Sequence, residues 1–123
     1  MPSKPTCPCE GQTLDRLLAP NILAFLADGP AHGYALVERL ATSPLMNGTK
    51  PDRAGVYRAL AAMEAQGTVT HSLRDSKIGP SKRLYQLTRD GRDCLKKWVV
   101  TLERYSSDVG ALAKTMREVA FRD

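Results

Sequence analysis

The stretch PDRAGVYRALAAMEAQGTV, residues 51–69, decides the fold. Four apolar side chains recur at helical spacing and lie within about 60° of Val56 on a helical wheel. They are Val56, Ala59, Leu60 and Met63. The stripe predicts a helix with one buried side. We expect the Asp52 carboxylate to cap its first turn and Gly67 to end it as the C′ residue.

The outer side of this predicted helix is lined by small residues and a single cation. They are Ala54, Gly55, Arg58, Ala61, Ala62 and Ala65. Small side chains let a helix approach another surface closely, and the major groove of DNA admits one helix. Arg58 would then reach a guanine edge or a phosphate. Packing of this face against another helix, with Arg58 in solvent, is the alternative.

More groups suited to phosphate lie at the start of the same helix. Lys50 precedes the first turn and Arg53 lies within it. Tyr57, at the border of the two faces, can offer its hydroxyl to a phosphate oxygen, and the helix N-terminus attracts anions. The first turns therefore favour a nucleic-acid partner.

Two helical patterns precede this stretch. In the first, Pro20 separates two apolar triplets, so either a short lead helix ends before it or one helix bends there. The triplets are Leu14, Leu17, Leu18 and Ile22, Phe25, Leu26. The turn-forming residues DGPAHG, 28–33, close it. A second helix is predicted over about residues 34–42, with Tyr34, Val37 and Leu40 on its apolar face.

A β-hairpin follows the helices. TVTHSLR, residues 68–74, alternates Val69, His71 and Leu73 with polar residues, and KRLYQLT, residues 82–88, is its return strand. The loop region between them is basic and polar, with Arg74, Lys77, Ser81, Lys82 and Arg83. Three short helices and then a hairpin is the order of a winged helix-turn-helix.

The last third carries a heptad seam that predicts a homodimer. After Thr88 and Asp90, which signal a helix start, apolar or aromatic residues are spaced alternately three and four apart over about 36 Å. The dimerisation residues are Leu95, Trp98, Leu102, Tyr105, Val109, Leu112 and Met116. YSSDVG, residues 105–110, could divide the region into two helices, and packing of the seam against the first helix of the same subunit stays open.

We therefore predict a mainly α chain with a small β-hairpin, a winged helix-turn-helix followed by a long C-terminal dimerisation helix. Its parts are a flexible N-terminal arm (1–13), a DNA-binding domain (14–90) and a C-terminal helical region (91–123). The net charge is +5, and residues 50–92 hold nine basic and four acidic groups, so the surplus lies in the middle of the chain. A basic block of this kind is typical of nucleic-acid binding proteins.

The composition indicates a cytoplasmic protein that is not an enzyme. The N-terminus lacks the apolar segment of a signal peptide, and NILAFLA is too short to span a bilayer. His32 and His71 have no nucleophile motif nearby, and no phosphate-cradling glycine loop is present. We expect no cofactor and no membrane partner. Cys7, Cys9 and Cys94 leave a thiol- or metal-responsive regulator open, although their spacing is not that of a typical zinc site.

Three blocks, GPAHGYALVERL, AGVYRALAAMEAQGTV and SKRLYQLTRDGR, resemble the signature of PadR-type transcriptional regulators over about residues 20–92. The resemblance implies a dimeric bacterial winged-helix protein, usually a repressor. It implies DNA contacts at Tyr57 and Arg58, wing contacts at Lys82 and Arg83, and structural roles for His32, Gly33 and Tyr34. Trp98 is similarly placed to a tryptophan that binds planar apolar effectors in some members. Ala54-Gly55 replaces the family's frequent Gly-Thr or Gly-Ser, so a hydroxyl contact is missing there.

Two functions remain in competition. The first is a homodimeric repressor that binds a pseudo-palindromic operator in double-stranded DNA and is released by a small apolar or aromatic effector. The second is a winged-helix protein–protein adaptor that does not bind DNA. The clustered cations of the predicted recognition helix and wing favour the repressor, because an adaptor has no need of them.

Overall fold

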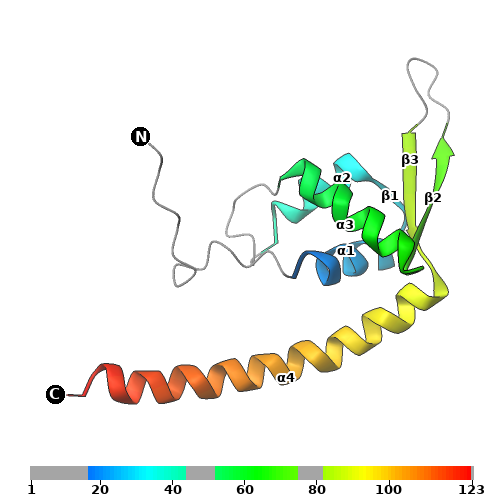
Figure 1. The fold of residues 1–123 in the computed structure, drawn as a ribbon. Helices are drawn as coiled ribbons and strands as arrows, with labels where there is room; N and C mark the ends of the chain where they lie inside the picture. The colour runs from blue at the N-terminus through cyan, green and yellow to red at the C-terminus, as the bar shows by residue number, and fades with distance from the viewer. Residues whose placement is uncertain (1–16, 44–51, 75–81, 123) are drawn as a thin grey trace, which may run out of the picture.

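The structure is a computed structural model that describes residues 17–43, 52–74 and 82–122. In order, these residues form α1 (Leu18–Ala27), β1 (Ala31–His32), α2 (Gly33–Leu40), α3 (Arg53–Ala65), β2 (Val69–Arg74), β3 (Lys82–Leu87) and α4 (Arg89–Ala120). Figure 1 shows three short helices packed together, the hairpin standing at one end, and α4 running beneath them. The predicted fold class, a winged helix-turn-helix with a long C-terminal helix, is confirmed.

The three short helices share one apolar core with the sheet. Its members are Ile22, Leu23, Leu26, Leu36, Val37, Leu40, Val56, Leu60, Met63, Val69 and Tyr85, all at most 4% exposed. The predicted stripe of the α3 helix is confirmed, because its three large residues are buried. On α2 the prediction was partly wrong: Leu36 joins Val37 and Leu40 in the core, whereas Tyr34 is 47% exposed.

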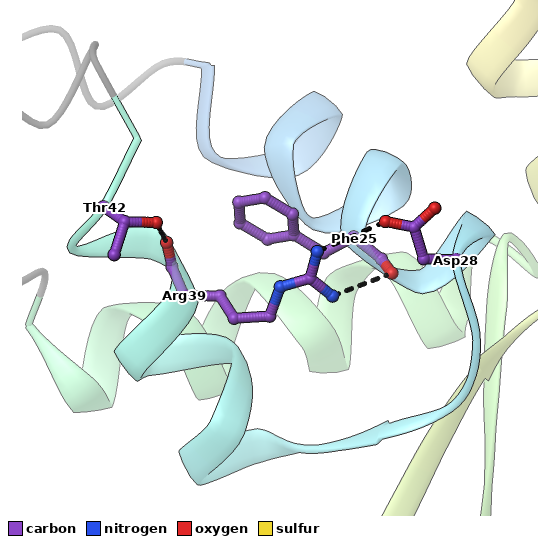
Figure 2. A network of polar contacts seen from close by, with 4 residues as sticks. All are labelled: Phe25, Asp28, Arg39 and Thr42. Carbon is purple, nitrogen blue, oxygen red and sulfur yellow. Dashed lines mark hydrogen bonds and ion pairs between the residues drawn. The ribbon is translucent and has the colours of Figure 1, made fainter.

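Pro20 lies in the first turn of α1, which begins only two residues earlier at Leu18. The first-turn amides of a helix have no partner within it, so a proline is tolerated there without a bend. The C-terminus of α1 is held by α2 (Figure 2). Arg39 lies 4.4 Å above the Phe25 ring, donates to the Phe25 carbonyl, and pairs with Asp28 at 3.3 Å. These contacts join α2 to the C-terminal end of α1.

The sheet has three strands in the order β1-β3-β2, all antiparallel. The predicted hairpin of β2 and β3, which we call the wing, is confirmed, with Val69 opposite Leu87 and Arg74 opposite Lys82. The residues DGPAHG close α1 as expected, and two of them also form a short strand that the sequence did not indicate, because Ala31 and His32 pair with Tyr85 and Leu84. Leu73, expected to alternate inward, is 63% exposed because the hairpin extends beyond the core there.

Of the two caps predicted for α3, the structure has the C-terminal one as expected and the N-terminal one only in part. Gly67 has φ of 83°, and the amides of Gly67 and Thr68 donate to the carbonyls of Glu64 and Met63, which is a Schellman ending. Asp52 occupies the N-cap position, but its side chain makes no hydrogen bond to the first turn. The predicted capping bond was therefore wrong, and the carboxylate lies instead 3.9 Å from the Arg58 guanidinium.

α4 is one uninterrupted helix of 32 residues, so it is about 48 Å long. Thr88 caps it by accepting from the Gly91 amide. Residues 105–110 are helical throughout, so the predicted interruption does not occur. Figure 1 shows the second half of α4 continuing past the other described elements. None of the helices in residues 17–43, 52–74 and 82–122 is both long and apolar enough to cross a membrane.

The heptad seam is divided between two environments. Leu95 and Trp98 pack against the core beside α1, and Leu102 is half-buried, so this part of the seam faces its own subunit. Beyond Leu102 the seam is in solvent, with 44–59% of each apolar residue exposed. These residues are Tyr105, Val109, Leu112, Met116 and Val119. Packing against the first helix of the same subunit, the alternative to the homodimer, therefore applies only to the first part of the seam, and no described element covers the rest.

Candidate nucleic-acid interface

The outer face of α3 is open. Its small residues Ala54, Ala61, Ala62 and Ala65 are exposed, and Gly55 is half-buried. The Arg58 side chain is 75% exposed, and its contact with Asp52 joins two solvated groups. Such an exposed pair contributes little to stability. No described element of the chain covers this face, so the alternative, packing of the face against another helix with Arg58 in solvent, is not met within the described part of one subunit.

The first turn of α3 and the start of β3 enclose a hollow of about 300 Å³, which we call the basic hollow. It is lined by His32, Gly33, Tyr34, Arg53, Tyr57, Lys82, Arg83 and Tyr85. Four of these residues were expected from the sequence to bind DNA. The structure brings together cations from a helix and from the wing although they are distant in the chain.

Tyr57 reaches the basic hollow by packing on Gly33. A Cβ atom added to Gly33 would lie 2.4 Å from Cε1 and 2.6 Å from the hydroxyl oxygen of Tyr57. Only glycine leaves room for the tyrosine ring at this first residue of α2. The structural role that the resemblance implies for Gly33 thus has a physical basis, which is the close approach of α2 and α3.

His32 and Tyr34 connect α2 to the wing. The Nδ1 atom of His32 is 2.9 Å from the Arg83 carbonyl oxygen. The His32 and Tyr34 rings stack with centroids 5.4 Å apart and planes 6° apart. The Lys82 ammonium lies 5.4 Å from the Tyr34 ring centroid, within the range of a cation–π contact. Sequence reasoning missed Tyr34 as a surface residue, because its spacing also fits the apolar face of α2.

Several predicted residues lie outside the described residues. They are Lys50, Lys77 and Ser81 of the expected DNA interface, and Cys7 and Cys9 of the expected thiol set. Cys94 is described, half-buried and packed against the core. Within the described ranges, no group of three or more His, Cys, Asp or Glu residues could hold a metal ion.

A second hollow lies between α1 and α4, with a volume of about 260 Å³. We call it the apolar hollow, and it is lined by Leu17, Pro20, Asn21, Ala24, Leu95, Trp98, Val99 and Leu102. Trp98 is therefore one of the residues that line an apolar hollow on the surface of the chain. The only amide side chain in this lining, Asn21, donates to the Leu17 carbonyl and accepts from Ser43, at 2.9 and 3.2 Å.

Comparison with protein families gives one match. The model of the transcriptional regulator PadR-like family matches residues 22–97, which is more than half of the chain. The matched range includes α2, α3, the wing, and the start of α4 through Lys97. A search of curated proteins finds no match.

Solved structures with the same fold include regulators from several organisms. A transcriptional regulator from Thermoplasma acidophilum has a TM-score of 0.72 at 23% identity, covering 82% of this chain and 94% of that one. A PadR family transcriptional regulator from Eggerthella lenta has a TM-score of 0.71 at 25% identity, covering 81% and 84%. Bacillus subtilis PadR in complex with operator DNA has a TM-score of 0.61 at 24% identity, covering 69% and 48%.

Proposed function

The chain belongs to the PadR-like family of transcriptional regulators, and on that premise we propose that it is a homodimeric repressor that binds a pseudo-palindromic DNA operator. One observation carries the proposal. The outer face of α3 carries no large side chain apart from Arg58, is open to solvent, and lies beside a hollow lined by cations. A structural relative, Bacillus subtilis PadR, has been solved with operator DNA, which supports the same partner here.

In this proposal α3 is the recognition helix. Its alanine face can enter the major groove closely, since that groove has room for one helix. Arg58 is the one long side chain on that face, and its contact with Asp52 is a weak, solvated one that DNA can replace. We assign Arg58 to a guanine edge, because a bidentate arginine–guanine pair is the commonest specific contact.

The wing and the first turn of α3 supply phosphate contacts. Arg53, Lys82 and Arg83 come from two elements but line one hollow. Phosphate contacts fix the register of a protein on the duplex without reading its sequence. A winged-helix adaptor, the alternative function, gives no reason for cations from separate elements to converge in this way.

Dimerisation would use the exposed half of α4. Four apolar or aromatic residues of the seam, Tyr105, Val109, Leu112 and Met116, are 44–59% exposed in one subunit. An apolar seam of this length rarely stays in water, so a second copy is the natural partner for it. Two paired subunits present two recognition helices at a fixed spacing and so select a pseudo-palindrome.

The apolar hollow suits a small planar apolar or aromatic effector. Trp98 and Leu95 form one wall and α1 forms the other, so a bound molecule would contact both helices. It would shift the equilibrium between two spacings of the recognition helices if it bound one better. A thiol- or metal-responsive regulator remains the second candidate, with only Cys94 of its three residues in the described structure.

The test is a selection of bound fragments from the genome of the source organism. We expect enrichment of one inverted repeat, and Arg58→Ala should weaken binding to it by about 1–3 kcal/mol. The same variant should change binding to a scrambled duplex much less. Equal recovery of all fragments, or recovery of none, would favour the adaptor and end the proposal.

A further inference from the structure

We propose that the basic hollow seats one phosphodiester group of the DNA backbone, and that Tyr34 is a phosphate-binding residue within it. This inference rests on the proposed function, because it assigns a specific part of the DNA partner to a specific site. Tyr34 was expected to be structural, and its place on the surface gives it a second role.

The charge of the hollow favours an anion. Arg53 comes from α3, whereas Lys82 and Arg83 come from β3, and all three line the same space. None of the described residues that line it is acidic. Cations gathered without a counter-charge repel one another, so the site is best satisfied when a group such as a phosphate occupies it.

Tyr34 is held in position by two neighbours. The His32 ring stacks on it at 5.4 Å with an interplanar angle of 6°, and the Lys82 ammonium lies 5.4 Å from its centroid. A ring fixed in this way loses little further freedom when its hydroxyl binds a ligand. Nearly half of the side chain is exposed although the residue lies on α2, which buries three leucine or valine side chains in the core.

Tyr57 completes the site from the third helix. Its hydroxyl lies 2.6 Å from where a Cβ of Gly33 would be, so it sits against the first residue of α2. Two tyrosines from different helices and three cations therefore line one hollow. Hydroxyls and charged donors of this kind are the groups that proteins use for DNA phosphates.

His32 acts as a positioning residue. Its Nδ1 contact with the Arg83 carbonyl joins the start of α2 to the start of β3. Together with the pairing of His32 with Leu84, this contact keeps Lys82 and Arg83 beside Tyr34. The basic hollow is thus formed by α2, α3 and the wing, and a DNA phosphate bound there would fix all three elements on the duplex.

The experiment compares Tyr34→Phe with the wild type on the selected operator, using fluorescence anisotropy. Phenylalanine keeps the ring and its stacking on His32 but removes the hydroxyl. We expect an affinity loss of roughly three- to tenfold, equal for specific and scrambled duplexes, because phosphate contacts carry no sequence information. Lys97→Ala, which removes an exposed cation of α4 outside the hollow, is the control for charge effects on affinity.

A second measurement locates the phosphate. Operators with one neutral methylphosphonate per half-site are scanned along each strand. At one position the substitution should weaken the wild type most and weaken Tyr34→Phe and Lys82→Ala less, since each variant has already lost one of the groups that contact that phosphate. Lys97→Ala should respond as the wild type does.

The possible outcomes distinguish a failure of this inference from a failure of the proposed function on which it rests. If the wild type binds the operator but Tyr34→Phe binds equally well and gives the same scanning pattern, the assignment of Tyr34 to a phosphate is wrong and the proposed function is unaffected. If Tyr34→Phe loses affinity only for the specific sequence, Tyr34 contacts a base and the assignment is again wrong. If the wild type binds no DNA, both the proposed function and the phosphate site are wrong.

Discussion

The Tyr57 ring of α3 lies directly on the Cα atom of Gly33 in α2, so closely that a Cβ there would be 2.4 Å from ring atom Cε1. This contact joins the proposed recognition helix to the helix before it. It also places Tyr57 in the basic hollow, which it reaches from the border of the exposed and buried faces of α3. A residue without a side chain thus determines where a predicted DNA contact lies.

Gly33→Ala should expel Tyr57 from the hollow. Because Tyr57 is 38% exposed, its side chain has room to move, and we expect the free energy of unfolding to fall by only about 1 kcal/mol. DNA affinity should fall to that of Tyr57→Ala, measured by anisotropy. In the Tyr57→Ala background the glycine change should then have no further effect on affinity. Independent, additive losses would show that the two residues do not act through this contact.

Two glycines of α4 should respond in opposite directions to alanine. A Cβ at Gly91 would lie 2.1 Å from the Thr68 carbonyl oxygen, a backbone atom, so Gly91→Ala should lower the free energy of unfolding by about 2–3 kcal/mol. Gly110 has nothing within 4 Å, and Gly110→Ala should raise the stability of the helix by roughly 0.5–1 kcal/mol. Urea unfolding monitored by circular dichroism measures both. Equal effects would contradict the close packing of α4 on the sheet.

Thr88 should stabilise the junction of the wing and α4 through two bonds. Its hydroxyl accepts from the Gly91 amide at 2.9 Å and donates to the Gly67 carbonyl at 2.6 Å. Thr88→Ala should cost about 0.5–2 kcal/mol of unfolding free energy, as loss of an N-cap does. Thr88→Ser keeps the hydroxyl and should retain most of that stability in the same urea titration. A serine variant as unstable as the alanine variant would rule out the hydroxyl as the cause.

An arginine on the exposed seam should separate the subunits without unfolding them. Leu112 and Met116 are 59% and 56% exposed, so Leu112→Arg or Met116→Arg should give a folded monomer by sedimentation velocity and circular dichroism. Ser107→Arg adds the same charge on the opposite side of α4 and should leave the dimer intact. A wild type that sediments as a monomer would contradict the dimer.

Leu60→Ala, in the core, should by contrast lower the unfolding free energy by about 2–5 kcal/mol.

Regular, periodic elements were predictable from the sequence. The stripe of α3 reflects burial of one face, and burial leaves a period in the sequence. The alternation in residues 68–74 predicted the strand β2, although only Val69 of its inward positions is fully buried. Gly67 was predictable as well, because a helix that ends with positive φ favours glycine. The cap at Thr88 followed from its place just before a helical pattern.

Contacts made by single residues were not predictable. β1 is two residues long, too short for any period, and exists only because β3 has a free edge beside it. Tyr34 fits an apolar face by spacing, yet its ring contacts both His32 and Lys82, and no local pattern encodes that arrangement. The seam reads as one heptad run, although α1 covers only its first part. Each of these depends on which elements meet in space.

The most direct test of the central claim, that α3 and the wing bind DNA through clustered cations, is the dependence of affinity on salt. Log affinity should fall linearly with log salt, with about 0.9 of slope for each phosphate contact. Lys82 would occur twice in the proposed dimer, so Lys82→Ala should reduce the slope by about 1.8, and Lys97→Ala should not change it. A shallow slope in the wild type, or one that Lys82→Ala leaves unaltered, would contradict the account.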